Sequence, residues 1–187
     1  MQMKHLLRMG GGIGVLALLL SAGSGLLMAQ SADSTEITNL LEQAKRHADL
    51  AVGDANTLWS YTSSRHAWQS HASRVNLMRE HINNLGKIHK DLSDMREQGS
   101  LWQKEAIDRI EPLLQEMADN LTNTINHMSE NRSHIQFKEY RDYTRANYEL
   151  AEKTAKTIGN FVEYGKAKSK AASLEEKLEL PAAPSTT

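Results

Sequence analysis

The chain has 187 residues, 40% hydrophobic and 24% charged, which is enough for one ordinary globular domain. Its formal net charge of -1 gives no sign of the basic surface that nucleic-acid-binding domains carry, so no nucleic-acid partner is expected. The sequence contains no cysteine, which excludes disulfides, thiolate metal sites and haem attached through cysteine.

Residues 1–29 have the layout of a secretory signal peptide, with two basic residues, an apolar run and then small residues. Cleavage is expected after Ala29, or alternatively after Ala32. The competing interpretation is an uncleaved membrane anchor, because the stretch 9–32 is uncharged and long enough to span a bilayer. Its glycines and serines favour cleavage. Either way, we predict that the rest of the chain is periplasmic or secreted.

A first helix is predicted from 33 to 62. Asp33 can cap its exposed N–H groups, and Glu36 is favourable near the positive end of the helix dipole. The helix carries a ladder of apolar residues at alternating spacings of four and three, the period of a helix that presents one face to partner helices. The members of this ladder are Ile37, Leu41, Ala44, Ala48, Ala51, Ala55 and Leu58.

The second helix, from 64 to 98, carries the ladder around which the fold is organised. Its members are Trp68, His71, Val75, Met78, Ile82, Leu85, His89 and Leu92. Gly99 is expected to end this helix in the left-handed conformation that often terminates helices. Ser100 and Gln103 then form a capping box that starts the third helix, from 100 to 131.

The third helix is interrupted by Pro112, which lacks the N–H donor that a helix interior needs. We therefore expect a kink or a restart of the helix within 108–112. The ladder of this helix has the same spacing of three and four residues. It consists of Ile107, Ile110, Leu114, Met117, Leu121, Thr124 and Met128.

A fourth helix is predicted from 134 to 172, where Ser133 and Gln136 fit a second capping box. Residues 173–187 are predicted to form a short helical turn followed by a disordered tail. The apolar face of the fourth helix is broader than the others. It contains Tyr140, Tyr143, Thr144, Asn147, Leu150, Ala151, Thr154, Ile158 and Phe161.

Four long helices joined by short turns predict an all-α fold, an antiparallel up-down-up-down four-helix bundle over 33–172. No segment shows the period-two alternation of a strand. The alternative is a longer coiled coil of two or three helices that completes its core by dimerising. The three well-marked turns favour the single-chain bundle.

This topology predicts that one end of the bundle collects histidines and aromatic residues. Counting from the turns places Asp54 level with His71, and His71 level with His127, so these three residues are candidate ligands for a Zn- or Cu-type ion. Alternatively, His71 and Met128 ligate a haem, as in bundles of the cytochrome b562 type. The residues expected at this end also include Trp59, Trp68, His134, Phe137 and Tyr140.

The favoured interpretation of His71 needs no cofactor. We expect a core histidine that is hydrogen-bonded to Asp54 or to a backbone carbonyl, because buried polar groups are nearly always paired. A metal site needs a specific ligand number and geometry, which spacing does not supply. The separation of His127 from His134 along a helix also keeps these two from sharing an ion.

The middle of the first helix is all alanine, and the facing part of the fourth helix is small and polar. This pairing leaves either a narrow ligand cavity or two closely packed helices. Close packing is favoured, because native interiors rarely contain sizeable voids. The residues concerned are Ala44, Ala48, Ala51 and Ala55 against Thr144, Asn147, Ala151 and Thr154.

No motif indicates catalysis. The sequence therefore predicts an exported, non-enzymatic helical bundle that acts as a structural, adaptor or binding module in the cell envelope. Its expected partner is an envelope protein of unknown identity or a second copy of the chain. The alternatives are a metal- or haem-binding periplasmic bundle, or the extracytoplasmic part of a membrane-tethered sensor. The chain contacts a membrane only if the N-terminal segment stays uncleaved.

Overall fold

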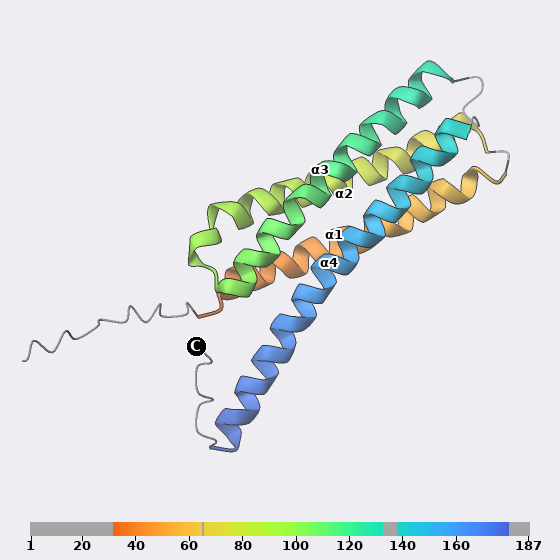
Figure 1. Cartoon of the computed structure of the whole chain (residues 1–187). Coiled ribbons are helices and arrows are strands. Elements are labelled where there is room, and N and C mark those ends of the chain that lie inside the picture. The colour runs from red at the N-terminus through yellow and green to blue at the C-terminus, as the bar shows by residue number, and fades with distance from the viewer. Residues whose placement is uncertain (1–31, 65, 133–137, 180–187) are drawn as a thin grey trace, which may run out of the picture.

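The structure, a computed structural model, describes residues 32–64, 66–132 and 138–179 (Figure 1). Within these ranges every regular element is a helix, which confirms the predicted all-α class for this part of the chain. The elements are α1 (Thr35–Tyr61), α2 (Trp68–Asp94), the short 3-10 helix η1 (Arg96–Gln98), α3 (Leu101–Glu130) and α4 (Lys138–Lys177). The predicted signal peptide, the second capping box and the tail after 180 lie outside the described residues.

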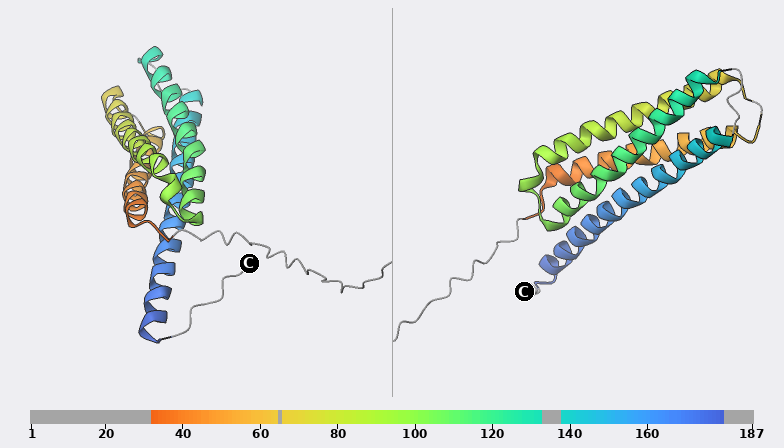
Figure 2. Two further views of the ribbon diagram at one scale, coloured as in Figure 1. Left: turned by 90° about the vertical axis from the view of Figure 1, so that its left-hand side faces the viewer. Right: turned by 45° about the horizontal axis from the view of Figure 1, so that its top comes forward.

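The four long helices enclose one hydrophobic core. α1 packs against α2 and α4, and α3 packs against the same two helices. Figure 2 shows the four helices lying side by side over most of their lengths. In the described ranges, none of these helices combines the length and hydrophobicity that crossing a membrane requires.

The predicted ladder of α1 is confirmed, because all seven of its residues are buried. In α2 the predicted ladder is wrong at His89, and its first member, Trp68, is only half-buried. Ile88 is buried and His89 is half-buried, with its Nε2 3.1 Å from the carbonyl oxygen of Ile107. From Leu85 to Leu92 the helical period fits an intermediate member at either 88 or 89. The apolar residue of the two, Ile88, takes the core position. The histidine keeps a polar partner at the edge.

The turn between α2 and α3 differs from the prediction. Gly99 is not left-handed but extended, with φ -79° and ψ 152°, and η1 separates it from the end of α2. Its lack of a side chain matters for a different reason. A Cβ there would lie 3.0 Å from Cδ1 of Ile37 and 3.2 Å from Cβ of Gln103, so glycine lets α1 and α3 approach this turn closely.

α3 begins with the predicted capping box, in which Ser100 and Gln103 exchange hydrogen bonds with each other's backbone N–H. The helix runs without interruption through Pro112, so the expected restart is wrong. The predicted ladder of α3 is buried throughout. The buried set of this helix also includes Gln103, Ala106 and Leu113.

α4 is longer than predicted, because residues 173–177 continue the helix and do not form a separate turn. Its buried ladder ends at Gly165, after which every described residue is exposed. We call residues 166–179 the overhang; it projects past the other helices at the blue end of the ribbon (Figure 1). The buried residues of α4 are Tyr140, Thr144, Asn147, Ala151, Thr154, Ile158, Val162 and Gly165.

Candidate functional site

The ends of α1 and α3 and the beginnings of α2 and α4 meet in a cluster of aromatic and imidazole rings. We call this cluster the histidine end. His71 lies edge-on to Tyr61 and to Tyr140, with ring centroids 5.4 Å apart in both pairs. Its members are Tyr61, His66, Trp68, His71, His127, Met128 and Tyr140. Of the residues predicted for this end, Trp68, His71, His127, Met128 and Tyr140 belong to the cluster. Asp54 and Trp59 have partners elsewhere, and His134 and Phe137 lie outside the described residues.

His71 is fully buried at the centre of the histidine end. Its Nδ1 lies 2.8 Å from the hydroxyl oxygen of Tyr140, and that hydroxyl donates its proton to the sulfur of Met128 at 3.7 Å. Nε2 of His71 is buried and has no hydrogen-bond partner among the described residues. The hydrogen bond to Tyr140 replaces the expected bond to Asp54 or to a backbone carbonyl.

Burial sets the charge of both members of this pair. It lowers the pKa of His71 to about 4, and the nearby imidazole of His66 adds to that effect. Burial raises the pKa of the Tyr140 hydroxyl above its usual value. At neutral pH both side chains are therefore uncharged, and their hydrogen bond joins α2 to α4.

The three candidate metal ligands are not brought to one point. His127 stacks on the ring of Tyr140, with centroids 5.8 Å apart, whereas Asp54 is engaged elsewhere. Among the described residues, no group of three or more histidine, aspartate or glutamate side chains is arranged to hold a metal ion. His71 and Met128 both meet Tyr140, so the tyrosine hydroxyl occupies the space between them.

Asp54 belongs to a second polar cluster, on the surface between α1 and α2. Its carboxylate accepts from Arg74 at 2.7 Å and lies 3.4 Å from Nε2 of His81. Nδ1 of His81 in turn lies 3.4 Å from Nδ1 of His47. Burial lowers the pKa of His47, and the neighbouring imidazole of His81 lowers it further.

Sequence reasoning missed this second cluster, although a signal for it exists. His47 and Asp54 lie seven residues apart in α1, and Arg74 and His81 lie seven apart in α2. Each of the four directly precedes a buried ladder residue. Residues beside two facing ladders meet across the groove between the helices, so the heptad spacing places all four on one seam.

The opposite end of the bundle is held by a polar clamp around Gln103, which is fully buried. The side-chain oxygen of Gln103 accepts from the backbone N–H of Ser34 at 2.9 Å and of Ser100 at 3.0 Å. Its amide nitrogen donates to the carbonyl of Ser34 at 2.7 Å and to the hydroxyl of Thr38 at 3.1 Å. This side chain uses its full hydrogen-bonding capacity to join the beginnings of α1 and α3.

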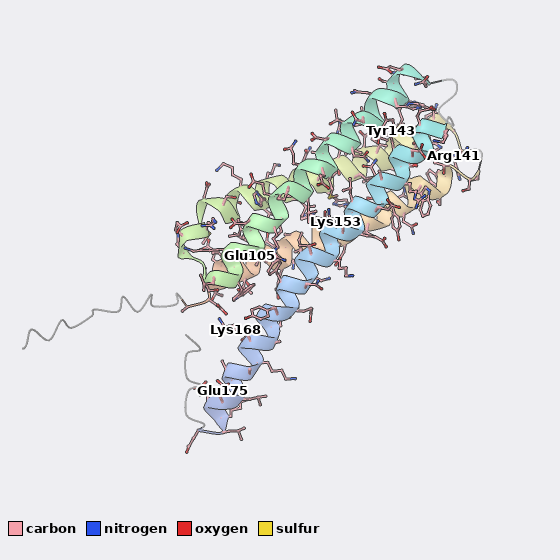
Figure 3. The ribbon with its side chains drawn as sticks, in the orientation of Figure 1. Glu105, Arg141, Tyr143, Lys153, Lys168 and Glu175 are labelled. Carbon is pink, nitrogen blue, oxygen red and sulfur yellow. The ribbon has the colours of Figure 1, made fainter. Side chains whose placement is uncertain are left out.

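Asp33 extends this clamp to α4. Its carboxylate accepts from the indole N–H of Trp102 at 2.8 Å and from Lys168 at 2.7 Å. Burial opposes ionisation of Asp33, but hydrogen bonds from Lys168, Ser100 and Trp102 outweigh it and lower the pKa of this carboxyl. Lys168, labelled in Figure 3, is therefore anchored to the start of α1.

The middle of α4 carries the remaining buried polar groups. Asn147 donates to the hydroxyl of Thr124 at 2.7 Å, and Asn120 donates to the carbonyl of Tyr143 at 3.1 Å. The alanine ladder of α1 is buried farther along α4, because Lys45 lies beside Gly159 and Trp59 stacks on Tyr148. These interactions fix how α3 and α4 align along their lengths.

Comparisons of this chain with known protein families, with curated proteins and with solved structures find no match.

Proposed function

We propose that this protein is an exported, non-enzymatic helical bundle that serves as a structural, adaptor or binding module in the cell envelope, either in the periplasm or outside the cell. The signal-peptide layout of residues 1–29 supports the export. The expected partner is another envelope protein or a second copy of the chain.

The proposed bundle has up-down-up-down topology. Two sets of contacts support it. Asp33 and Trp102 join the beginnings of α1 and α3, and His71 and Tyr140 join the beginnings of α2 and α4. Neighbours along the chain then run in opposite directions, as short connections require.

The use of the buried polar groups supports a non-enzymatic role. His71, Gln103 and Asn147 each bond to a side chain or backbone group of another helix. These buried polar groups join helices to one another, so we expect interactions with other molecules to take place on the outer surface. The observation that carries the proposal is the overhang, a helical surface that extends beyond the bundle with all of its described residues exposed.

Cell fractionation and N-terminal sequencing of the full-length gene product test the export. The proposal expects a processed protein that begins at Gln30 or Asp33 and is released with the soluble envelope fraction. An intact N-terminus in the cytoplasm contradicts export. An intact N-terminus in the membrane fraction contradicts release and makes the chain a tethered domain.

In-cell photo-crosslinking tests the role as a binding module. A photoreactive residue at Leu178 in the overhang is expected to give a discrete adduct. The same residue at Leu50, which is comparably exposed on α1, serves as the matched control. Adducts of equal yield at both positions, or at neither, contradict a role for the overhang in binding.

A further inference from the structure

A regular apolar ladder begins at Tyr164, one residue before the buried ladder ends, and runs through the overhang. Tyr164, Ala167, Ala171, Leu174 and Leu178 follow one another at spacings of three, four, three and four residues. That is the a/d spacing of a coiled coil. Tyr164, Leu174 and Leu178 are 53%, 48% and 65% exposed, and both alanines are exposed as well. A ladder of this kind is stable against a partner helix. Tyr164 lies edge-on to Trp102 of α3, with ring centroids 5.6 Å apart, whereas the four later members are exposed in the described part of the chain.

Beyond Tyr164, which contacts α3, most of this apolar face lies on the side of α4 opposite the core. At about 100° per residue, the five ladder residues fall within roughly 80° of arc, nearly opposite the arc of Ile158, Val162 and Gly165, which face the core. On its other side this part of α4 forms a groove with Thr38 and Glu42 of α1, which Lys170 and Leu174 also line. Ala167, Ala171 and Leu178 are exposed and do not line this groove, so a helix from outside can reach them directly.

We propose that the overhangs of two copies of this chain pair with each other as a short parallel coiled coil. The ladder supplies the buried seam, and the charges beside it select the partner and its direction. This inference does not depend on export, because it concerns only the surface of the folded chain.

The charged residues that flank the ladder complement themselves in a parallel pair. In heptad terms Tyr164 and Ala171 are a positions, so Lys170 is a g position and Glu175 is the e position of the following heptad. Interhelical ion pairs in parallel coiled coils join these positions. Lys170 of each copy therefore lies beside Glu175 of the other copy, so the symmetric dimer contains this ion pair twice. Neither residue has an ion pair of its own in the described part of the chain.

A second interhelical ion pair also favours the parallel arrangement. Glu163 and Lys168 occupy the preceding g and e positions and also carry opposite charges. Lys168 is already bonded to Asp33, so this pair competes with the clamp and contributes less. The Lys170–Glu175 pair is therefore the one that selects the partner.

An antiparallel pair is disfavoured by the same charges. In antiparallel pairs, e positions face e positions and g positions face g positions. An antiparallel alignment that pairs Lys168 with Glu175, both e positions, therefore brings the g position Lys170 of one copy toward Lys170 and Lys177 of the other. The seam spans about 20 Å of helix, at 1.5 Å per residue. An interface of that size belongs to the small, transient class, so we expect a weak and reversible dimer.

Sedimentation equilibrium of the purified protein, with the N-terminus that the cell leaves on it, tests the pairing. The wild type should change reversibly from monomer to dimer as its concentration rises. The Leu174→Ser/Leu178→Ser variant should keep the helical circular dichroism and melting of the dilute wild type, and its dimer Kd should rise at least about tenfold. Leu50→Ser removes a similarly exposed leucine from α1 and should dimerise like the wild type.

Charge reversal tests the direction of the pair. Lys170→Glu alone, or Glu175→Lys alone, should weaken the dimer, and the double variant should restore it, because opposite charges again face each other. In an antiparallel pair, Lys170→Glu places a glutamate near Lys177 and strengthens association. Strengthening by the single reversal therefore overturns the parallel arrangement.

Disulfide trapping gives an independent readout, since the chain has no cysteine of its own. Under mild oxidation Ala167→Cys should form covalent dimers, because d positions face each other in a parallel seam. Ser169→Cys, on the other side of the helix, should not. A wild type that stays monomeric at millimolar concentration overturns the proposal. So does a dimer that survives the loss of both leucines, or an overhang that binds anionic vesicles as a monomer.

Discussion

The two parts of α4 reverse the usual relation between side-chain size and burial. Inside the bundle the ladder is built largely from small and polar residues, such as Thr144, Asn147 and Ala151, and all of them are buried. In the overhang the ladder contains Leu174 and Leu178, and both are about half exposed or more. The neighbouring helices decide burial here. Inside the bundle α1 and α3 pack along α4 and cover even small side chains, whereas Leu174 and Leu178 have no such cover.

The largest effect is expected inside the bundle, at the clamp. Gln103→Ala removes a side chain that satisfies four groups, two of them backbone N–H donors at buried or half-buried positions. Leaving such groups unpaired costs about 1–3 kcal/mol each, so we expect a loss of about 3 kcal/mol in the free energy of unfolding. Urea titration followed by circular dichroism measures it. Gln98→Ala, at an exposed position nearby, is the control, and equal losses in both variants contradict the account.

The second effect concerns the pH dependence of the bundle. The pKa of His71 is about 4 in the folded protein and 6.5 in the unfolded chain, so the unfolded chain binds the extra proton first. The contribution of His71 to stability is complete above pH 6.5 and falls as the pH drops toward 4. Between pH 7 and pH 4.5 this costs about 2–3 kcal/mol.

Urea titrations of the wild type and of His71→Leu at these two pH values isolate that contribution. The variant changes stability at pH 7 through its altered packing, so only the difference between the two pH values is compared. We expect the variant to lose about 2–3 kcal/mol less than the wild type on acidification. Equal losses show that His71 does not carry the effect.

The third effect marks the border between bundle and overhang. A Cβ at Gly165 would lie 2.8 Å from the ring of Trp102, so Gly165→Ala should displace that ring and cost about 1–2 kcal/mol. Gly86 has no heavy atom within 4 Å of the position where its Cβ would lie. Gly86→Ala should therefore stabilise α2 by about 0.5–1 kcal/mol. Thermal unfolding of both variants checks the opposite signs, and a stabilising Gly165→Ala contradicts the packing of Trp102.

The smallest effect is expected in the overhang itself. Lys170→Ala and Leu178→Ser change exposed side chains that hold no other helix in the dilute protein. We expect each to change the free energy of unfolding by less than about 0.5 kcal/mol. Chemical denaturation at low protein concentration measures this. A loss as large as that of Gln103→Ala means that the overhang is part of the cooperative core.

The sequence predicts the ladders well, because their period of three and four residues reports directly on which side of a helix is covered. The period alone does not resolve a step such as Ile88 against His89, since both residues fit it. The structure buries Ile88 and leaves Nε2 of His89 beside the carbonyl of Ile107. The predicted end of the fourth helix, at 172, is too early, because no buried residue after Gly165 marks where the helix continues. Residues such as Glu175 and Lys177 are good helix formers, however, and continue the helix without burial.

The candidate site was less predictable than the helices. Counting from the turns places His71, His127 and Tyr140 at one end, but carries an error of at least a helical turn. That error is enough to exchange the partner of His71, which is Tyr140 where Asp54 was expected. Asp54 pairs with Arg74 and His81 because side chains beside the ladders meet across helices, a rule that the ladder residues alone do not reveal.

Hydrogen exchange of the purified protein at low and at high concentration tests the central claim most directly. That claim is that α1 to α4 protect one core by themselves up to Gly165, while the overhang is helix without a partner. The account predicts slow exchange within the bundle at both concentrations, and fast exchange at 166–179 that slows only in the concentrated protein. Equal protection of bundle and overhang in the dilute protein contradicts it.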